Sequence, residues 1–190
     1  MTTTLGAAMA GGNPTLGRVK DEFYPTPNTC TIGLMELEQH FIRSHTDCVW
    51  ECACGDGKMS DIIDEYGFTV ISTDLVDRGY GSQMDFLATT AGKEKVAIVT
   101  NPPFNLAPQF IEHAIGYFEV PYLALLLKST FWHAKRRLPL FRKYPPSVIY
   151  PMTWRPDFMN RGAPTMDCSW MIWDVSRPGT MYIPMEHPRV

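Results

Sequence analysis

The stretch Val49-Trp50-Glu51-Cys52-Ala53-Cys54-Gly55-Asp56-Gly57 passes from an apolar run into a glycine turn. Residues 58–66 follow it directly and show the apolar spacing of a helix. The glycines allow a tight turn and let a ligand approach the backbone closely, and a helix that begins there offers free N–H groups to an anionic group. The pattern therefore predicts a strand, a turn and a helix with a ligand site at the turn, although an ordinary strand-to-helix turn carries the same glycines.

The chain around this stretch alternates strand-like and helix-like segments. We expect helices at 106–118 and 134–144, and strands at 69–75, 96–100, 122–127, 147–152 and 168–175. Apolar strands separated by helices predict a mostly parallel sheet that helices cover on both faces. Ligands of such sheets bind beyond the carboxyl ends of the strands. The candidate site residues follow the ends of these predicted strands.

Length and composition indicate one globular domain. The chain has 190 residues, of which 45% are hydrophobic and 19% charged. We expect residues 1–20, rich in Thr, Gly, Ala and Pro, to form a flexible lead-in and residues 21–190 to form the domain. No apolar run is long enough for a membrane span, and the N-terminus lacks the features of a signal peptide. Five cysteines within apolar runs favour a reduced, cytoplasmic compartment.

Charge is distributed unevenly along the chain. Residues 1–120 hold 7 Lys and Arg against 16 Asp and Glu, whereas residues 121–190 hold 10 against 4. The imbalance favours contact of the C-terminal half with a polyanion, although a solvated surface would show it too. The basic and aromatic residues that we expect to contact nucleic acid are Lys135, Arg136, Arg137, Arg142, Lys143, Trp154, Arg155 and Arg161.

Two carboxylates follow the glycine turn at positions suited to a nucleoside. Asp74 ends the second predicted strand, where a carboxylate can bind ribose hydroxyls, a layout shared by nucleotide and methyl-donor sites. Asp85 can accept a hydrogen bond from an adenine amino group, and Phe86 can pack on the adenine ring. A surface acid beside a core phenylalanine is the alternative interpretation of that pair.

The cysteines of the glycine turn do not indicate a metal site. Cys52 and Cys54 are separated by one residue, and no matching Cys or His pair follows them. We expect small buried side chains beneath the turn and no metal.

The most specific signal is Asn101-Pro102-Pro103-Phe104, which follows the strand predicted at 96–100. Proline cannot donate to a sheet ladder, so the strand ends here and the Pro102 carbonyl is free to face a ligand. The Asn101 side chain adds a second carbonyl, and two acceptors suit a planar NH2 group. Phe104 supplies a flat face for an aromatic ring.

These motifs together resemble a known family. Asn101–Phe104 resembles the catalytic motif of S-adenosylmethionine-dependent amino-methyltransferases, and Glu51–Gly57 resembles their first cofactor motif. Phe23-Tyr24-Pro25-Thr26-Pro27 is similar to a segment of DNA N6-adenine methyltransferases that touches the methionine moiety. Residues 154–158, 162–164 and 169–174 are similar to small phage-type members. The resemblance covers residues 22–175 approximately, and the missing large target-recognition domain argues against strong sequence specificity.

The resemblance implies a fold, a cofactor and an activity. The fold is a single Rossmann-like class I methyltransferase domain, with a mostly parallel seven-stranded sheet and one antiparallel strand near the C-terminus. The activity is methyl transfer to the N6 amino group of adenine in DNA, with Asn101, Pro102, Pro103 and Phe104 as catalytic residues. S-adenosylmethionine is the implied cofactor, bound by Phe23, Tyr24, Pro25, Thr26, Glu51, Cys52, Ala53, Gly55, Gly57, Asp74, Leu75, Asp85, Phe86 and Asn101.

Other substrates and one other class of protein stay open at this point. Cytosine N4, RNA adenine and a protein glutamine amide present the same planar amino group. A non-catalytic protein that binds the cofactor or nucleic acid is the alternative from another class. We expect DNA rather than RNA as partner, no membrane contact, a monomer or weak homodimer, and a phage or bacterial gene product in the host cytoplasm.

Overall fold

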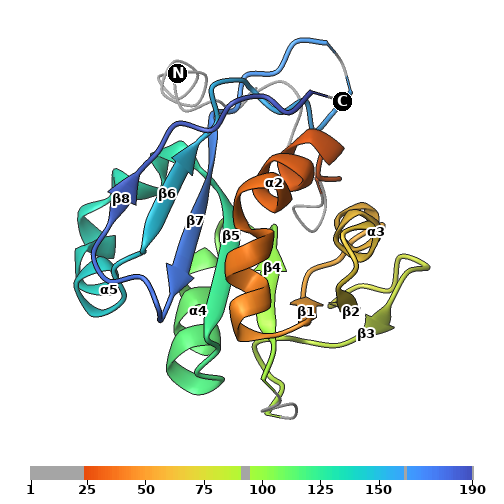
Figure 1. Cartoon of the computed structure of the whole chain (residues 1–190), viewed down its shortest axis with the longest axis horizontal. Coiled ribbons are helices and arrows are strands. Elements are labelled where there is room, and N and C mark those ends of the chain that lie inside the picture. Colours follow the sequence, from red (N-terminus) through yellow and green to blue (C-terminus); the bar gives the residue numbers. More distant parts are fainter. Residues whose placement is uncertain (1–23, 91–94, 161, 190) are drawn as a thin grey trace, which may run out of the picture.

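An eight-stranded sheet forms the centre of the computed structural model, which describes residues 24–90, 95–160 and 162–189 (Figure 1). Its strand order is β3-β2-β1-β4-β5-β7-β6-β8. Within these residues β7 runs antiparallel to both its neighbours, and the other neighbouring pairs are parallel. The strands are β1 (Cys48–Glu51), β2 (Thr69–Asp74), β3 (Ser82–Gln83), β4 (Ala97–Thr100), β5 (Tyr122–Lys128), β6 (Val148–Pro151), β7 (Cys168–Asp174) and β8 (Met181–Tyr182).

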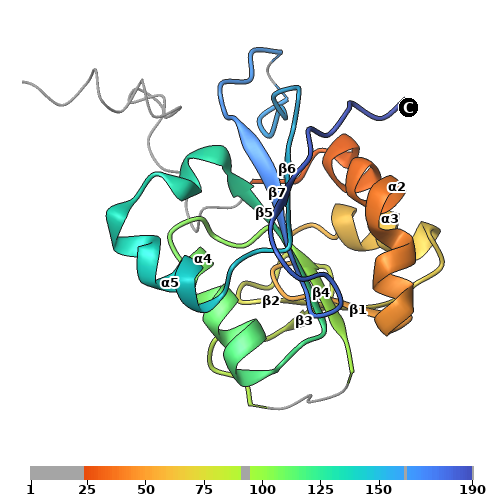
Figure 2. The same cartoon turned by 60° about the vertical axis from the view of Figure 1, so that its left-hand side comes forward.

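Helices cover both faces of the sheet. Figure 2 shows α2 (Asn28–His45) and α3 (Lys58–Glu65) on one face, and α4 (Ala107–Ile111) and α5 (Leu138–Lys143) on the other. The alternation of side chains along β5 explains the two layers, because Tyr122 packs in the core cluster of α2 and Leu123 in that of α4. Shorter helical turns are a π-helix at Glu112–Tyr117 after α4 and 3-10 turns at Ser129–Trp132 and Lys135–Arg137.

The predicted α/β architecture is confirmed, including the antiparallel strand near the C-terminus. Each predicted strand is present with shifts of a residue or two at its ends. The described sheet has eight strands rather than the seven that the resemblance implies: the six strands predicted from the sequence, with the two-residue strands β3 and β8 added at its edges. Such short strands contain too few residues for an alternating pattern, so no local signal predicts them.

The helix predicted at 134–144 is shorter than expected. Residues Lys135–Arg137 form a 3-10 turn, and the α-helix begins only at Leu138. Pro139 accounts for the late start, since proline lacks an N–H and is tolerated only in the first turn of an α-helix.

A buried polar network anchors α2 to the sheet. The Glu38 carboxylate is fully buried and accepts hydrogen bonds from the Tyr122 and Tyr150 hydroxyls at 2.8 and 2.6 Å. Arg177 donates to both Glu38 oxygens and, through Nε, to Asp174 at 2.7 Å. Burial alone would raise the pKa of Asp174, but hydrogen bonds from Ser176, with others from the network, hold it below its ordinary value. The network therefore fixes the position of α2, which starts directly after residues 24–27.

The expected flexible lead-in, residues 1–20, lies outside the described residues. Among the helices that the structure describes, none is long and apolar enough to cross a membrane.

Candidate active site

A cavity of about 500 Å³ lies beyond the carboxyl ends of β1, β2 and β4. Its volume falls within the range of roughly 300–1,000 Å³ usual for small-molecule sites. Most of the predicted cofactor and catalytic residues line it: Tyr24, Pro25, Thr26, Glu51, Cys52, Ala53, Gly55, Asp74, Leu75, Asp85, Phe86, Asn101, Pro102, Pro103 and Phe104. The fold thus brings together five separate segments of the chain, at 24–26, 51–55, 74–75, 85–86 and 101–104.

The glycine turn is tied to the end of β2 by Asp74. Gly55 has a positive φ of 57°, and its N–H donates to Asp74 Oδ2 at 2.9 Å. The Val76 N–H donates to Asp74 Oδ1 at 2.9 Å. Each carboxylate oxygen keeps further lone-pair capacity for a ligand.

Gly57 has a different position from the one expected. It is the N-cap of α3 with a φ of 84°, and a Cβ at this position would overlap the ring of Tyr80. Gly57 is not among the cavity-lining residues. It therefore shapes the start of α3 and does not face the cavity.

Three further residues predicted to bind the cofactor differ in exposure. Leu75 is 59% exposed and presents apolar surface to the cavity, whereas Phe86 is 3% exposed and packs in the core against Trp50 and Phe118. Phe86 therefore offers little ring surface to a ligand. Asp85 is exposed at the rim, and its Oδ1 accepts the Leu87 N–H.

Glu51 is a buried acid in the cavity wall. It is 2% exposed, and the Ser60 hydroxyl donates to its Oε2. Burial raises the pKa of Glu51 to about 8. A cationic group of a ligand in the cavity would favour the ionised form of this carboxyl.

Asn101 has a defined orientation. Its Nδ2 donates to Thr26 Oγ1 at 3.0 Å and lies 3.5 Å from the Tyr24 carbonyl oxygen. Because the amide nitrogen faces the N-terminal segment, Oδ1 stays available as an acceptor. The neighbouring Pro102 carbonyl accepts no hydrogen bond within the described residues, whereas the Pro103 carbonyl accepts the Leu106 N–H.

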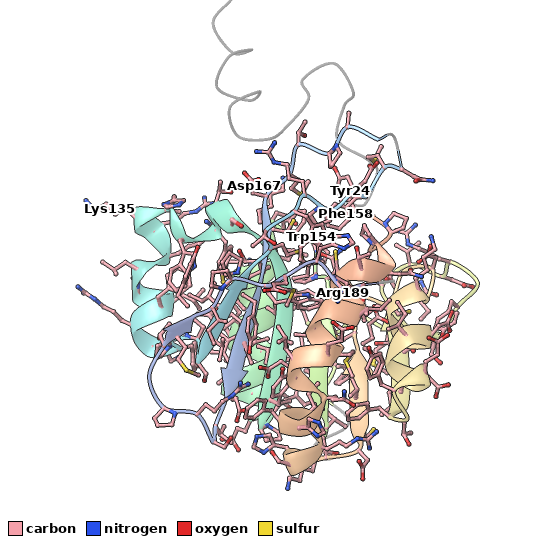
Figure 3. The ribbon with its side chains drawn as sticks, turned by 45° about the horizontal axis from the view of Figure 1, so that its top comes forward. Tyr24, Lys135, Trp154, Phe158, Asp167 and Arg189 are labelled. Atoms are coloured by element: carbon pink, nitrogen blue, oxygen red, sulfur yellow. The ribbon has the colours of Figure 1, made fainter. Side chains whose placement is uncertain are left out.

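Phe104 belongs to an aromatic cluster at the edge of the cavity. Its ring stacks on Tyr24 with centroids 6.3 Å apart and an interplanar angle of 26°. Tyr24 meets Phe158 edge to face, also at 6.3 Å, and both lie together beyond the end of the sheet in Figure 3. The Lys128 ammonium lies 4.9 Å from the Phe104 centroid. The sequence pattern assigns no role to Phe158 or Lys128, since an aromatic in a loop and a lysine after an apolar strand are common.

The predicted nucleic-acid residues are not part of this cavity. Lys135, Arg136, Arg142 and Lys143 are exposed, and Figure 3 places Lys135 far from Tyr24 on the side of α5. Arg137 instead donates to the Phe131 carbonyl at 2.7 Å and lies over the Phe131 ring.

Two more of these predicted residues have protein partners. Arg155 forms an exposed ion pair with Asp167 at 2.8 Å. Trp154 packs edge to face on His187 and approaches Gly33, an arrangement typical of a structural aromatic. Phe23 and Arg161 lie outside the described residues.

The cysteines of the turn are buried thiols. Burial raises the pKa of Cys52 well above its ordinary value and that of Cys54 to about 12. Among the residues that the structure describes, no group of three or more His, Cys, Asp or Glu is placed to hold a metal ion.

Solved structures share this architecture at low sequence identity. A protein from Listeria monocytogenes assigned to the class I S-adenosylmethionine-dependent methyltransferases is 15% identical, with a TM-score of 0.61 over 84% of this chain and 65% of that one. One from Pyrococcus horikoshii assigned as an RNA methyltransferase is 14% identical, with a TM-score of 0.62 over 81% and 87%. The methyltransferase subunit of a type I restriction-modification system from Streptococcus thermophilus is 11% identical, with a TM-score of 0.58 over 85% and 47%.

These likenesses show that the chain has the class I methyltransferase fold. The chain spans just under two thirds of the Listeria protein and about half of the Streptococcus subunit. No protein-family model and no curated protein matches the sequence.

Proposed function

We propose that the chain is an S-adenosylmethionine-dependent methyltransferase that acts on the N6 amino group of adenine in DNA. The observation that carries the proposal is the orientation of Asn101, whose amide nitrogen is tied to Thr26. Its Oδ1 and the Pro102 carbonyl are then two acceptors on one rigid loop, and they match the two hydrogens of an amino group. Preorganised carbonyl dipoles also stabilise the positive charge that grows on an attacking amino nitrogen.

The residues around the cavity fit the proposed cofactor. Asp74 would bind the ribose, Asp85 the adenine amino group, and Leu75 the face of the adenine ring. The backbone at Gly55 would lie under the methionine end, whose ammonium group suits the acidic wall at Glu51. When bound, S-adenosylmethionine supplies an electrophilic methyl group on a sulfonium sulfur.

Asp74→Ala should weaken binding of S-adenosylhomocysteine by roughly 1–3 kcal/mol, the scale of a hydrogen bond to a charged group. The substitution would remove the proposed ribose acceptor and would also release the Gly55 N–H, so both effects act in the same direction. Titration calorimetry measures the affinity. Asp77→Ala is the matched control, because Asp77 is an exposed acid on the same loop whose Oδ1 accepts the Gly79 N–H. Equal affinity of the Asp74 variant and the wild type would contradict the assignment.

The aromatic cluster favours a nucleobase over a glutamine amide as the acceptor. Phe104 and Tyr24 are partly exposed, stack on each other and line the same cavity as Asn101 and Pro102, and stacking on such rings would stabilise a base that has left its duplex. A glutamine side chain has no ring to use this surface. The basic residues of the C-terminal half are consistent with a nucleic acid, since phosphate contacts provide affinity without sequence information.

Lys135→Ala with Arg136→Ala should make the dependence of DNA affinity on salt shallower. The expected change in the log–log slope is about 0.9 for each phosphate that the variant no longer neutralises. Arg137 is left in place because it holds the Phe131 carbonyl. Fluorescence anisotropy over a salt series measures the slope. Lys95→Ala is the control, because Lys95 is exposed and precedes the start of β4, at the end away from the cavity. An unchanged slope in the double variant would mean that these side chains are merely solvated.

The activity is tested by incubating the protein with labelled S-adenosylmethionine and, in parallel, unmethylated DNA, RNA and a glutamine-containing peptide. Digestion of the DNA and RNA to nucleosides and mass analysis then identify the product. N6-methyladenine from DNA supports the proposal. N4-methylcytosine, or label in RNA or the peptide, would show that the substrate is not adenine in DNA. Cofactor binding without transfer to any acceptor would favour a binding protein.

A further inference from the structure

Lys128 lies beside the proposed reactive loop without being part of the cavity. It is the last residue of β5, and the register that pairs Thr100 with Leu125 carries Lys128 beyond the end of β4, where Asn101 begins. Its side chain is partly buried, and its ammonium is 4.9 Å from the Phe104 centroid. Lys128 is not among the residues that line the cofactor cavity, so it contacts Phe104 from outside that cavity.

No ion pair joins Lys128 to a carboxylate within the described residues. Asp167, which precedes its register partner Cys168, is already paired with Arg155 at 2.8 Å. The acids of the site, Glu51, Asp74 and Asp85, all line the cavity instead. Asp56 and Arg78 line the cavity as well, whereas the Lys128 ammonium lies outside it, beside Phe104.

An ammonium at this place needs an anion when the site works. Positive charge grows on an amino nitrogen during its methylation, and a second positive charge nearby would oppose it. An anion that arrives with the substrate removes this penalty. A nucleotide carries such an anion, because each base in a strand is attached to a phosphodiester.

We propose that Lys128 binds a backbone phosphate next to the target nucleotide and thereby positions the base on Phe104. The inference rests on the proposed function and adds a partner for one residue of the same site. Lys128 is a positioning residue in this scheme, because it contacts the substrate backbone and not the amino group. A lysine suits the task as a compact charge on a flexible stem.

Lys128→Met keeps the apolar stem and removes the charge. We expect its KM for an oligonucleotide with one methylatable adenine to rise by about tenfold, since a hydrogen bond to a charged group is worth at least that factor. The single-turnover rate at saturating DNA and the affinity for S-adenosylhomocysteine should stay near the wild-type values. Lys128→Arg should restore most of the KM, and Lys95→Met, at the other end of the sheet, is the matched control.

A methylphosphonate at the phosphate on either side of the target adenine provides the second half of a double-mutant cycle. For the wild type, one of the two neutral linkages should raise KM by about as much as Lys128→Met does. For Lys128→Met the same linkage should have no further effect.

The outcomes distinguish failure of this inference from failure of the proposed function on which it rests. The role of Lys128 would be overturned if Lys128→Met had the wild-type KM. It would also be overturned if the increases in KM caused by Lys128→Met and by the methylphosphonate multiplied when the two were combined. Methyl transfer by the wild type would persist in both cases. Absence of transfer by the wild type would overturn the proposed function, and the inference with it.

Discussion

Asn101→Ala is expected to lower the single-turnover rate of methyl transfer by about 100- to 1000-fold, the cost of removing one preorganised partner of developing charge. Asn101 Oδ1 is one of the two proposed acceptors for the target amino group, and its removal leaves only the Pro102 carbonyl. The amino nitrogen would then be held by one hydrogen and would lose its orientation. Single-turnover measurement on saturating DNA isolates this step from binding and product release.

The hydrogen bonds of Asn101 define the control. The Asn101 amide also donates to Thr26 Oγ1, so the alanine variant removes a structural hydrogen bond together with the acceptor. Thr26→Val removes the same hydrogen bond and keeps Oδ1. It should cost about tenfold in rate, the value of one net hydrogen bond.

Affinity for S-adenosylhomocysteine distinguishes a role of Asn101 in methyl transfer from a role in cofactor binding. It should change little in Asn101→Ala, because the ribose and adenine contacts proposed for Asp74 and Asp85 remain. If Asn101→Ala kept more than about a tenth of the wild-type rate, which is far above the range given for such a loss, the loop would not be the reactive centre. Equal losses in Thr26→Val and Asn101→Ala would instead mean that Asn101 acts only by holding the N-terminal segment.

The strand ends of the site could be predicted from the sequence because each carries its own local signal. A run of apolar residues stops at a glycine turn, at an acid or at Pro-Pro, and parallel strands bring such ends to one edge of the sheet. These signals predicted many of the residues that line the cavity, whereas Tyr24, Pro25 and Thr26 were indicated only by the family resemblance, and lining residues such as Met59 and Phe110 were not predicted. The signals could not reveal the orientation of Asn101, since Thr26 is 75 positions away in the chain.

The helix α2 shows why other features of the fold could not be predicted from the sequence. Its sequence contains Thr29, Thr31, Ile32 and Gly33, which lower helix propensity near its start. Gly33 is placed by tertiary packing, because a Cβ there would lie 3.1 Å from Met185 Sδ and 3.7 Å from Trp154. Those partners come from later parts of the chain, so no local pattern could reveal the reason for the glycine. The contact between Lys128 and Phe104 could not be predicted for a similar reason, because Phe104 lies in the loop that follows another strand.

Arg177→Met is expected to lower the free energy of unfolding by about 3–5 kcal/mol, the range for breaking a buried ion pair from one side. Glu38 and Asp174 have side chains with 0% exposure, and that of Arg177 is 12% exposed. Methionine retains most of the apolar stem, so packing is disturbed little. The cost arises because the Glu38 carboxylate loses both guanidinium hydrogen bonds and cannot reach water.

Arg155→Met is the matched control in the same chain. Arg155 and Asp167 form an ion pair at a similar N–O distance, 2.8 Å, but their side chains are 56% and 62% exposed. Exposed pairs contribute about 0–1 kcal/mol, since water screens the charges and each partner is solvated when the other is removed. Urea unfolding of both variants measures the difference, provided that the m value is unchanged.

A double variant distinguishes loss of charge balance from loss of packing. Glu38→Gln with Arg177→Met removes both charges and leaves a neutral amide, whose oxygen can accept from one of the two tyrosine hydroxyls while its NH2 group donates to the other. It should be more stable than Arg177→Met alone, because no uncompensated carboxylate remains at position 38. If Arg177→Met cost no more than Arg155→Met, the network would not stabilise α2. If the double variant were no more stable than the single one, the arginine would act through its packing on Phe41, whose ring centroid lies 4.0 Å from the guanidinium carbon.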